Sequence, residues 1–281
     1  MSLESAKWIR KMMLILNWLM VLINISVSQS RTLEFYERIE TDSIYLDLKN
    51  HLHGPVFLKF QFDSSVADVV RGPKSLVIQP QDSLKHLFSF PRSIIQVDSL
   101  FNWSDYMDVT ANLGDPYNSS HDDGAIYVLP FLKDKKYQIL QSWNGSFSHY
   151  SVESKFAIDF TMPEGDTICA ARSGVVVRTD DQYSENGGKE LKDKANQIVI
   201  LHNDGTLAFY VHLLHKGVLV RAGEQVHAGQ VIGLSGNTGY STRPHLHFVV
   251  REAPGKAIPI YFKGYQRKKI NKGKWVKRKA P

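Results

Sequence analysis

The tripeptide His-Leu-His occurs twice in the chain, at residues 51–53 and 245–247, and only the second copy opens an apolar, strand-like run. Side chains of an extended strand alternate between its two faces, so His245 and His247 should point to one side while Leu246 points to the other. Two imidazoles at this spacing can face a single metal ion. The second copy is therefore the first candidate for a chemical site.

Two more polar residues interrupt apolar runs of the same kind. Asp159 lies within "KFAIDF" and His212 closes "LAFYVHL". An acid in such a strand is costly to bury unless it binds a cation or another partner. Two histidines and one carboxylate with an open fourth position form a ligand pattern of catalytic zinc, which acidifies bound water. Spacing alone leaves two alternatives open, a structural metal site or unrelated core histidines.

Short β-type runs make up the part of the chain that must position these residues. Between residues 31 and 130, alternating or β-branched runs are separated by turn-forming clusters, which predicts a small β-sandwich-like domain. From residue 136 to 261 the pattern stays β-type, which predicts a second domain. We therefore expect a mainly β chain with strands at 43–48, 56–62, 75–80, 93–97, 125–131, 156–160, 174–178, 196–202, 206–213, 230–234 and 245–252.

Turn signals separate the strands expected in the second domain. Asn-Asp-Gly at 203–205 predicts a tight hairpin turn. The polar, glycine-containing stretch 180–195 predicts an exposed loop. In "RAGEQVHAGQVIG", at 221–233, Ala-Gly pairs alternate with apolar pairs, and glycine permits sharp corners between very short strands. Lipoyl and biotinyl carrier domains share such a pattern, but they need a modifiable lysine, and residues 217–239 contain none.

The N-terminus and the composition indicate an exported globular protein. Basic residues precede a short apolar run that ends in small residues, which predicts a signal peptide over residues 1–28, with an uncleaved membrane anchor as the alternative. A hydrophobic content of 43% in 281 residues is enough for a core. The single cysteine, Cys169, excludes an internal disulfide and is interpreted as a buried apolar residue.

The basic charge is concentrated at the C-terminus. Residues 262–281 hold nine Lys or Arg and no acid, so the formal charge of +6 leaves about −3 for the rest of the chain. We interpret this basic tail as a solvated, mobile end. The functional alternative is a tether to an anionic envelope surface, with only weak, unspecific attraction to nucleic acid.

Residues 136–252 resemble the lysostaphin-type (LytM-like) zinc metallopeptidases, which cut peptidoglycan cross-bridges. The resemblance rests on several motifs in the order in which the family has them. They are "SWNGSFSH", "FAIDFTMPEGD", "CAARSGVVV", "NQIVILHNDGTLAFYVHL", "VRAGEQVHAGQVIGLSGNTGYST" and "PHLHF". It implies that the second domain is an antiparallel β-sheet peptidase domain.

The resemblance also assigns roles to five residues. His149, Asp159 and His247 would hold one zinc ion per chain, and His212 and His245 would be the catalytic pair that moves protons. Two positions depart from the family pattern: nine residues separate His149 from Asp159, so a loop must bulge between them, and Trp143 replaces a common tyrosine.

The function implied is a zinc metalloendopeptidase that hydrolyses peptide bonds in peptidoglycan cross-links. We expect it to be a monomer, exported to the periplasm or cell envelope or secreted. The alternative is a non-catalytic wall-binding or hydrolase-activating module of the same fold, and a third reading is a structural zinc-stabilised adhesin. All five matched polar residues are present, which favours the enzyme.

Overall fold

The computed structural model describes residues 33–94, 101–265 and 270–279. The expected signal peptide lies outside them. No helix in these ranges is long and apolar enough to cross a membrane. The described chain is mainly β, as the sequence predicts, and forms two compact units. The first takes its described residues from 1–50, 60–74 and 82–109, and the second takes them from 51–59, 75–81 and 110–281.

The first unit is built on a three-stranded antiparallel sheet of order β1-β2-β5. Its strands are β1 (Leu33–Ile39), β2 (Ser43–Asn50) and β5 (Ser83–Pro91). Burial alternates along β2, where Ile44, Leu46 and Leu48 are buried, as expected for a strand with one face on a core. Phe88 of β5 packs edge-on against Phe60, with ring centroids 4.7 Å apart.

A second small sheet has the order β4-β3-β6. It contains β3 (Val56–Phe62), β4 (Ser75–Ile78) and β6 (Met107–Leu113), and two 3-10 helices, η1 (Arg92–Ile94) and η2 (Trp103–Asp105), lie between β5 and β6 in the chain. The strands expected at 43–48, 56–62 and 75–80 are confirmed. The run 125–131 is not a regular strand, since only Tyr127 and Phe131 form isolated bridges. The run 93–97 starts in η1 and continues outside the described residues.

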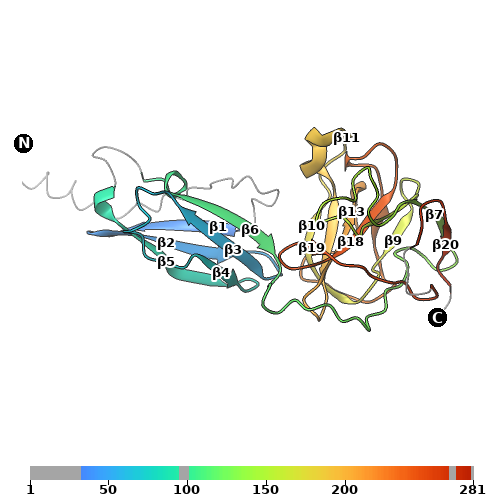
Figure 1. Cartoon of the computed structure of the whole chain (residues 1–281), viewed down its shortest axis with the longest axis horizontal. Helices are drawn as coiled ribbons and strands as arrows, with labels where there is room; N and C mark the ends of the chain where they lie inside the picture. The colour runs from blue at the N-terminus through green and yellow to red at the C-terminus, as the bar shows by residue number, and fades with distance from the viewer. Residues whose placement is uncertain (1–32, 95–100, 266–269, 280–281) are drawn as a thin grey trace, which may run out of the picture. The chain divides into compact units, whose positions relative to one another are not determined.

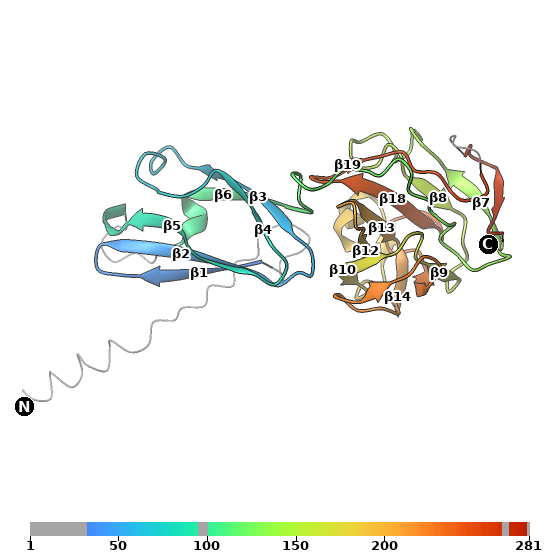
Figure 2. The same cartoon turned by 90° about the horizontal axis from the view of Figure 1, so that it is seen from below.

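The largest sheet lies in the second unit and has the order β15-β10-β12-β13-β18-β8-β7-β20, with β19 beside β18 (Figures 1 and 2). The pairs that form it are antiparallel. Its strands are β7 (Lys136–Gln141), β8 (Ile158–Phe160), β10 (Gly174–Asp180), β12 (Gln197–Leu201), β13 (Leu207–Val211), β15 (Gln225–Val226), β18 (Leu246–Glu252), β19 (Lys256–Ala257) and β20 (Trp275–Lys277).

Shorter elements complete this unit. A three-stranded sheet of order β14-β16-β9 contains β9 (Thr167–Cys169), β14 (Leu213–Val218) and β16 (Val231–Ser235). The predicted turn at 203–205 joins β12 to β13, and Gly205 has the positive φ of 79° that this turn needs. The expected loop 180–195 holds β11 (Asn186–Gly187), parallel to β17 (Gly239–Tyr240), and the 3-10 helix η3 (Lys189–Lys194).

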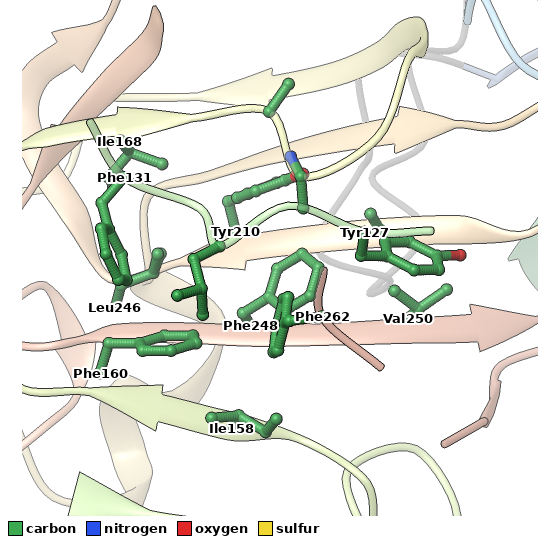
Figure 3. Packing of buried hydrophobic residues seen from close by; sticks show 14 of the residues in the cluster. Tyr127, Phe131, Ile158, Phe160, Ile168, Tyr210, Leu246, Phe248, Val250 and Phe262 are labelled. Carbon is green, nitrogen blue, oxygen red and sulfur yellow. The ribbon is translucent and has the colours of Figure 1, made fainter. Parts of the chain in front are cut away.

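The core of the second unit lies on one face of the large sheet (Figure 3). Leu246, Phe248 and Val250 of β18 project into it beside Ile158 and Phe160 of β8, with Ile168 and Ile232 of the smaller sheet in the same cluster. Burying one such side chain contributes roughly 1.5–3 kcal/mol. Because strand faces alternate, this packing leaves His247 and Asp159 on the opposite face of the sheet.

The described part of the basic tail is not simply solvated. Strand β20 pairs with β7, and Val276 is fully buried. Ile270 is also buried. The end of the chain therefore contributes an edge strand to the large sheet, whereas the sequence predicts a mobile segment.

Candidate metal centre

Neighbouring strands of the large sheet hold the central polar residues in one row. Register places His247 of β18 opposite Asp159 of β8, and Asp159 opposite Gln141 of β7. On its other side His247 faces Val211, the residue before His212. Positions far apart in sequence are thus fixed beside one another by backbone hydrogen bonds of the sheet.

Three potential ligands converge at this row. His149, Asp159 and His247 each offer one atom, and these atoms lie within 4.8 Å of one another. Asp159 Oδ1 lies 3.1 Å from His149 Nε2 and 2.8 Å from His247 Nδ1, and the two ring nitrogens are 3.3 Å apart. Within the described ranges, no other group of three His, Cys, Asp or Glu side chains converges in this way.

The tautomer of His149 shows that this set suits a cation. His149 is fully buried, and its Nδ1–H donates to the Ser142 carbonyl at 3.0 Å. In a neutral ring Nε2 is then unprotonated, and its lone pair faces Asp159 Oδ1. Two facing lone pairs repel unless a proton or a cation lies between them. Two imidazole nitrogens and one carboxylate oxygen are ligands that zinc accepts, so the residues fit this ion.

The charge state of Asp159 agrees with a ligand role. Burial alone would raise the pKa of Asp159, but its close contacts with the His149 and His247 rings outweigh burial and hold its pKa well below the usual value. Burial lowers the pKa of His247, and its contact with Asp159 opposes that only in part. A carboxylate beside neutral imidazoles is the ionisation state that binds a divalent metal.

Gln141 holds the outer oxygen of Asp159. Its amide Nε2 donates to Asp159 Oδ2 at 3.2 Å and to Ser148 Oγ at 2.8 Å, and its Oε1 accepts from Phe147 N at 3.1 Å. A Cβ at Gly145 would lie 2.4 Å from Gln141 Cγ, so glycine is needed there. Gln141 thereby ties the loop that carries His149 to the carboxylate. Sequence reasoning missed it, because only the β7–β8 register reveals its place.

The second pair, His212 and His245, lies next to these three residues. The two rings are 4.6 Å apart between centroids, and His212 is 5.9 Å from His247. His212 Nδ1–H donates to Thr238 O at 2.7 Å, and His245 Nδ1–H donates to Arg243 O at 2.8 Å. Each ring therefore keeps Nε2 as its free basic nitrogen.

Burial decides the charge of His212. Burial first, and then neighbouring His245 and His247, lower the pKa of His212 to about 3, so the ring is neutral at pH 7. His212 also has a positive φ of 67°, which ends β13 and reorients the side chain. Thr238 fixes this corner, since its Oγ1 donates to Leu213 O at 2.9 Å and accepts from Asn196 N at 3.0 Å.

Aromatic and basic residues lie close in the chain to several of the five polar ones. Phe147 and Tyr240 stack at a centroid distance of 5.6 Å, and Phe147 is 56% exposed. Trp143 is buried against Phe156 and Tyr261, and its Nε1 has no hydrogen-bond partner among the described residues. Trp143 thus acts by packing. Arg243 contributes its carbonyl to His245, and its side chain is exposed.

Other histidines lie apart from this centre. His51 and His53 lie between β2 and β3, outside any strand. His202 is buried beside Arg172 and lines a separate cavity of about 500 Å³, with Asn203 and Ser173 on the same wall.

Most of the residues of this centre lie in a part of the chain that matches a known protein family. Residues 153–260 match Peptidase family M23, and this part of the chain belongs to that family. Asp159, His212, His245 and His247 lie inside the matched range, and His149 precedes it. The sequence-based resemblance is confirmed at the level of the family.

Individual relatives match over parts of their length. "Peptidoglycan DD-endopeptidase ShyA" of Vibrio cholerae is 33% identical over 191 residues, which cover 59% of this chain and 37% of that protein. Lysostaphin of Staphylococcus simulans is 44% identical over 94 residues, 33% of this chain and 17% of its own. "Murein hydrolase activator NlpD" of Salmonella dublin is 36% identical over 99 residues, 35% of this chain and 26% of that protein. The matched region thus spans well under half of each relative.

A solved structure of lysostaphin is also similar to part of this chain. Lysostaphin from Staphylococcus simulans aligns with a TM-score of 0.34 and 34% identity, over 44% of this chain and 47% of that chain.

Proposed function

We propose that the chain is a zinc-dependent metalloendopeptidase that hydrolyses peptide bonds in peptidoglycan cross-links. The observation that supports this most directly is the convergence of His149, Asp159 and His247 beside the His212 and His245 pair. Membership of a peptidase family and similarity to named peptidoglycan endopeptidases favour the substrate class. We further propose that the chain is exported and acts as a monomer in the periplasm, in the envelope or outside the cell.

The hydrogen bonds of these residues support the role that we propose for each. His149, Asp159 and His247 would hold one zinc ion, which supplies Lewis acidity for a water molecule and for the scissile carbonyl. His212 is a neutral base, and backbone carbonyls fix the Nδ1–H groups of both His212 and His245. Their Nε2 atoms can take a proton from the attacking water and return one to the leaving amine. Zinc and this histidine pair together suffice for hydrolysis, so no serine or cysteine nucleophile is required.

Digestion of purified peptidoglycan by the full chain tests this function. Fragments are identified by mass, with and without a chelator, for the wild type and for His247→Ala. His227→Ala is the matched control, because His227 is an exposed histidine outside the centre. We expect cross-link cleavage that is lost with the chelator and in His247→Ala and retained in the control. Cleavage that survives complete zinc removal overturns the mechanism.

A non-catalytic, hydrolase-activating module is the second candidate, and the similarity to an activator favours it. The same assay separates the two functions when a second, independent wall hydrolase is added. An activator would release no fragments alone but would raise the rate of the added enzyme, and His247→Ala would leave that stimulation unchanged.

A further inference from the structure

The edge formed by β7 and β20 exposes a strongly basic surface with one aromatic ring. Register pairs Trp275 with Gln138 and Lys277 with Lys136, and Val276 and Tyr137 between them are buried. Because strand faces alternate, the side chains of these four residues share the outer face. Trp275 is 58% exposed. The exposed lysines of the adjoining segments complete what we call the basic edge: Lys133, Lys135, Lys272, Lys274 and Lys279.

The charges of the basic edge are poorly compensated. Asp134 is the sole acid within 131–141 and 270–279. Lys136 and Lys277 lie directly opposite each other on paired strands, and like charges in this arrangement destabilise a sheet. Their ammonium groups diverge: Lys136 Nζ lies 5.5 Å from the centroid of the Trp275 ring, and Lys277 Nζ lies 3.3 Å from Asp134. A bound anion would relieve the remaining repulsion.

The basic edge shares a sheet face with the metal centre. Tyr137 and Ile139 of β7 face the core together with Phe160, which lies opposite Ile139. Lys136 and Gln138 therefore lie on the other face, the one that carries Asp159. A strand advances about 3.3 Å per residue and neighbouring strands are about 4.8 Å apart, so an extended polymer can reach from the edge to the centre.

We propose that the basic edge binds an acidic glycan polymer and aligns it over the face that holds the metal centre. One exposed indole can stack on the apolar C–H face of one sugar ring, while the lysines pair with carboxylates along the chain. A single-stranded nucleic acid gains its base stacking from several spaced aromatic rings, whereas an anionic membrane attracts lysines by charge alone, so both serve as comparisons in the test. The outer face of β7 and β20 offers one ring. That the glycan belongs to the envelope rests on the proposed function.

Binding of the full chain to polygalacturonate, a linear acidic polysaccharide, tests the proposal without any hydrolysis. Affinity is measured by titration calorimetry at two salt concentrations, with neutral dextran as the uncharged comparison. We expect salt-sensitive binding to polygalacturonate and none to dextran. The double variant Lys136→Gln/Lys277→Gln should weaken binding about thirtyfold, since each lysine near an anionic surface contributes about 1 kcal/mol and every 1.4 kcal/mol is a factor of about ten.

Matched variants separate the edge from total charge. Lys189→Gln/Lys192→Gln removes the same charge from η3 and should leave affinity unchanged. Trp275→Ala should cost about tenfold by loss of stacking, and Trp275→Tyr, which keeps a ring, should recover most of it. Unchanged binding in the edge double variant overturns the proposal. Equal or tighter binding of single-stranded DNA or phosphatidylglycerol vesicles, with the same sensitivity to the edge variants, also overturns it.

The outcome is independent of catalysis. If peptidoglycan digestion fails while edge-dependent glycan binding holds, the proposed enzyme function fails and the binding surface stands. If digestion is metal-dependent but the edge variants bind normally, only the binding surface is wrong.

Discussion

At the scale of single residues, backbone carbonyls decide which nitrogen of a histidine ring carries the proton. His149, His212 and His245 each donate Nδ1–H to a carbonyl, of Ser142, Thr238 and Arg243 respectively, which leaves Nε2 as the ring nitrogen without a backbone partner. His247 differs, because its Nδ1 faces Asp159. The centre therefore depends on where the chain places a few carbonyl oxygens as much as on the histidines themselves.

This arrangement predicts that metal binding and catalysis can be separated by substitution. His247→Ala removes a proposed ligand and should abolish tight zinc binding. His212→Ala removes a proposed proton carrier that is not a proposed ligand, so zinc should still bind while peptide cleavage falls by roughly 10²–10⁴-fold. Zinc is measured by competition with a chromogenic chelator and cleavage by fragment analysis. Equal loss of zinc in both variants would contradict the separate roles.

Gln141 should influence the centre without touching a substrate. Gln141→Leu keeps the volume of the side chain but removes the donor to Asp159 Oδ2 and the acceptor for Phe147 N. Loss of such an outer partner lowers metal affinity by about 10–100-fold. Gln138→Leu is the matched control, since Gln138 lies on the same strand and bonds Gly273 O at the surface. A folded Gln141→Leu protein with wild-type zinc affinity would show that Asp159 needs no such support.

The sequence could predict part of this centre. An acid or a histidine inside an apolar run can be recognised from the sequence as a candidate site residue, because burying it without a partner is unfavourable. His149 lies in the polar segment between β7 and β8 and carries no such signal, so only the family resemblance pointed to it. Gln141 carries none either, since its role depends on a strand register that no local pattern encodes.

At the scale of elements, the turn between β16 and β17 positions His212. Thr238 joins three segments: its carbonyl holds His212, and its hydroxyl links Asn196 N to Leu213 O. Asn196 is itself fully buried and bonds the carbonyls of Tyr183 and Leu213. This network fixes the end of β13 against the segment that leads to His245.

Thr238→Val tests this network with a side chain of similar shape. It leaves buried Asn196 N–H and Leu213 C=O without a hydroxyl partner, which should lower the free energy of unfolding by about 1–3 kcal/mol. The carbonyl of residue 238 remains, so zinc affinity should change little while cleavage falls through misplacement of His212. Chemical denaturation and zinc titration measure the two effects. Thr242→Val, at an exposed position, is the control and should change neither.

Elements with strong local signals were predicted well. The Asn-Asp-Gly turn fixes the β12–β13 hairpin, and glycine corners set off the short strands β15 and β16. Two predictions failed for physical reasons. Tyr127 and Phe131 are buried in the core without a regular ladder, so apolar alternation there reflects packing. Strand β20 has a single buried residue, Val276, within a lysine-rich segment. One buried position is too short a pattern to predict a strand from the sequence.

At the scale of the whole molecule, one buried histidine far from the proposed site links folding to pH. His202 is 3% exposed, and its Nδ1–H donates to Ser173 O at 2.9 Å. Its Nε2 has no hydrogen-bond partner among the described residues. Burial first, with smaller contributions from Arg172 and His121, lowers the pKa of His202 to about 4, against the opposing effects of the hydrogen bond to Ser173 O and of Asp204.

The depressed pKa of His202 sets the sign of the pH dependence. In the unfolded chain this histidine takes up a proton below about pH 6.5, whereas the folded chain resists until about pH 4. The unfolded state therefore binds more protons in this window, and stability falls as the pH is lowered through it. At pH 5 the contribution of His202 to this loss should reach about 2 kcal/mol relative to pH 7.5.

Urea unfolding at pH 7.5 and pH 5, in the presence of chelator, measures this effect in wild type and in His202→Gln. The variant removes the titrating ring, so its stability should change less between the two pH values, whatever its absolute stability. The exposed His227→Gln serves as control and should keep the wild-type pH dependence. Asp204, whose pKa is lowered through its contacts with Thr206 and Arg172 despite burial, loses its contribution only below about pH 4 and does not overlap this window. Identical pH dependence in wild type and His202→Gln would show that His202 does not govern the acid sensitivity of the fold.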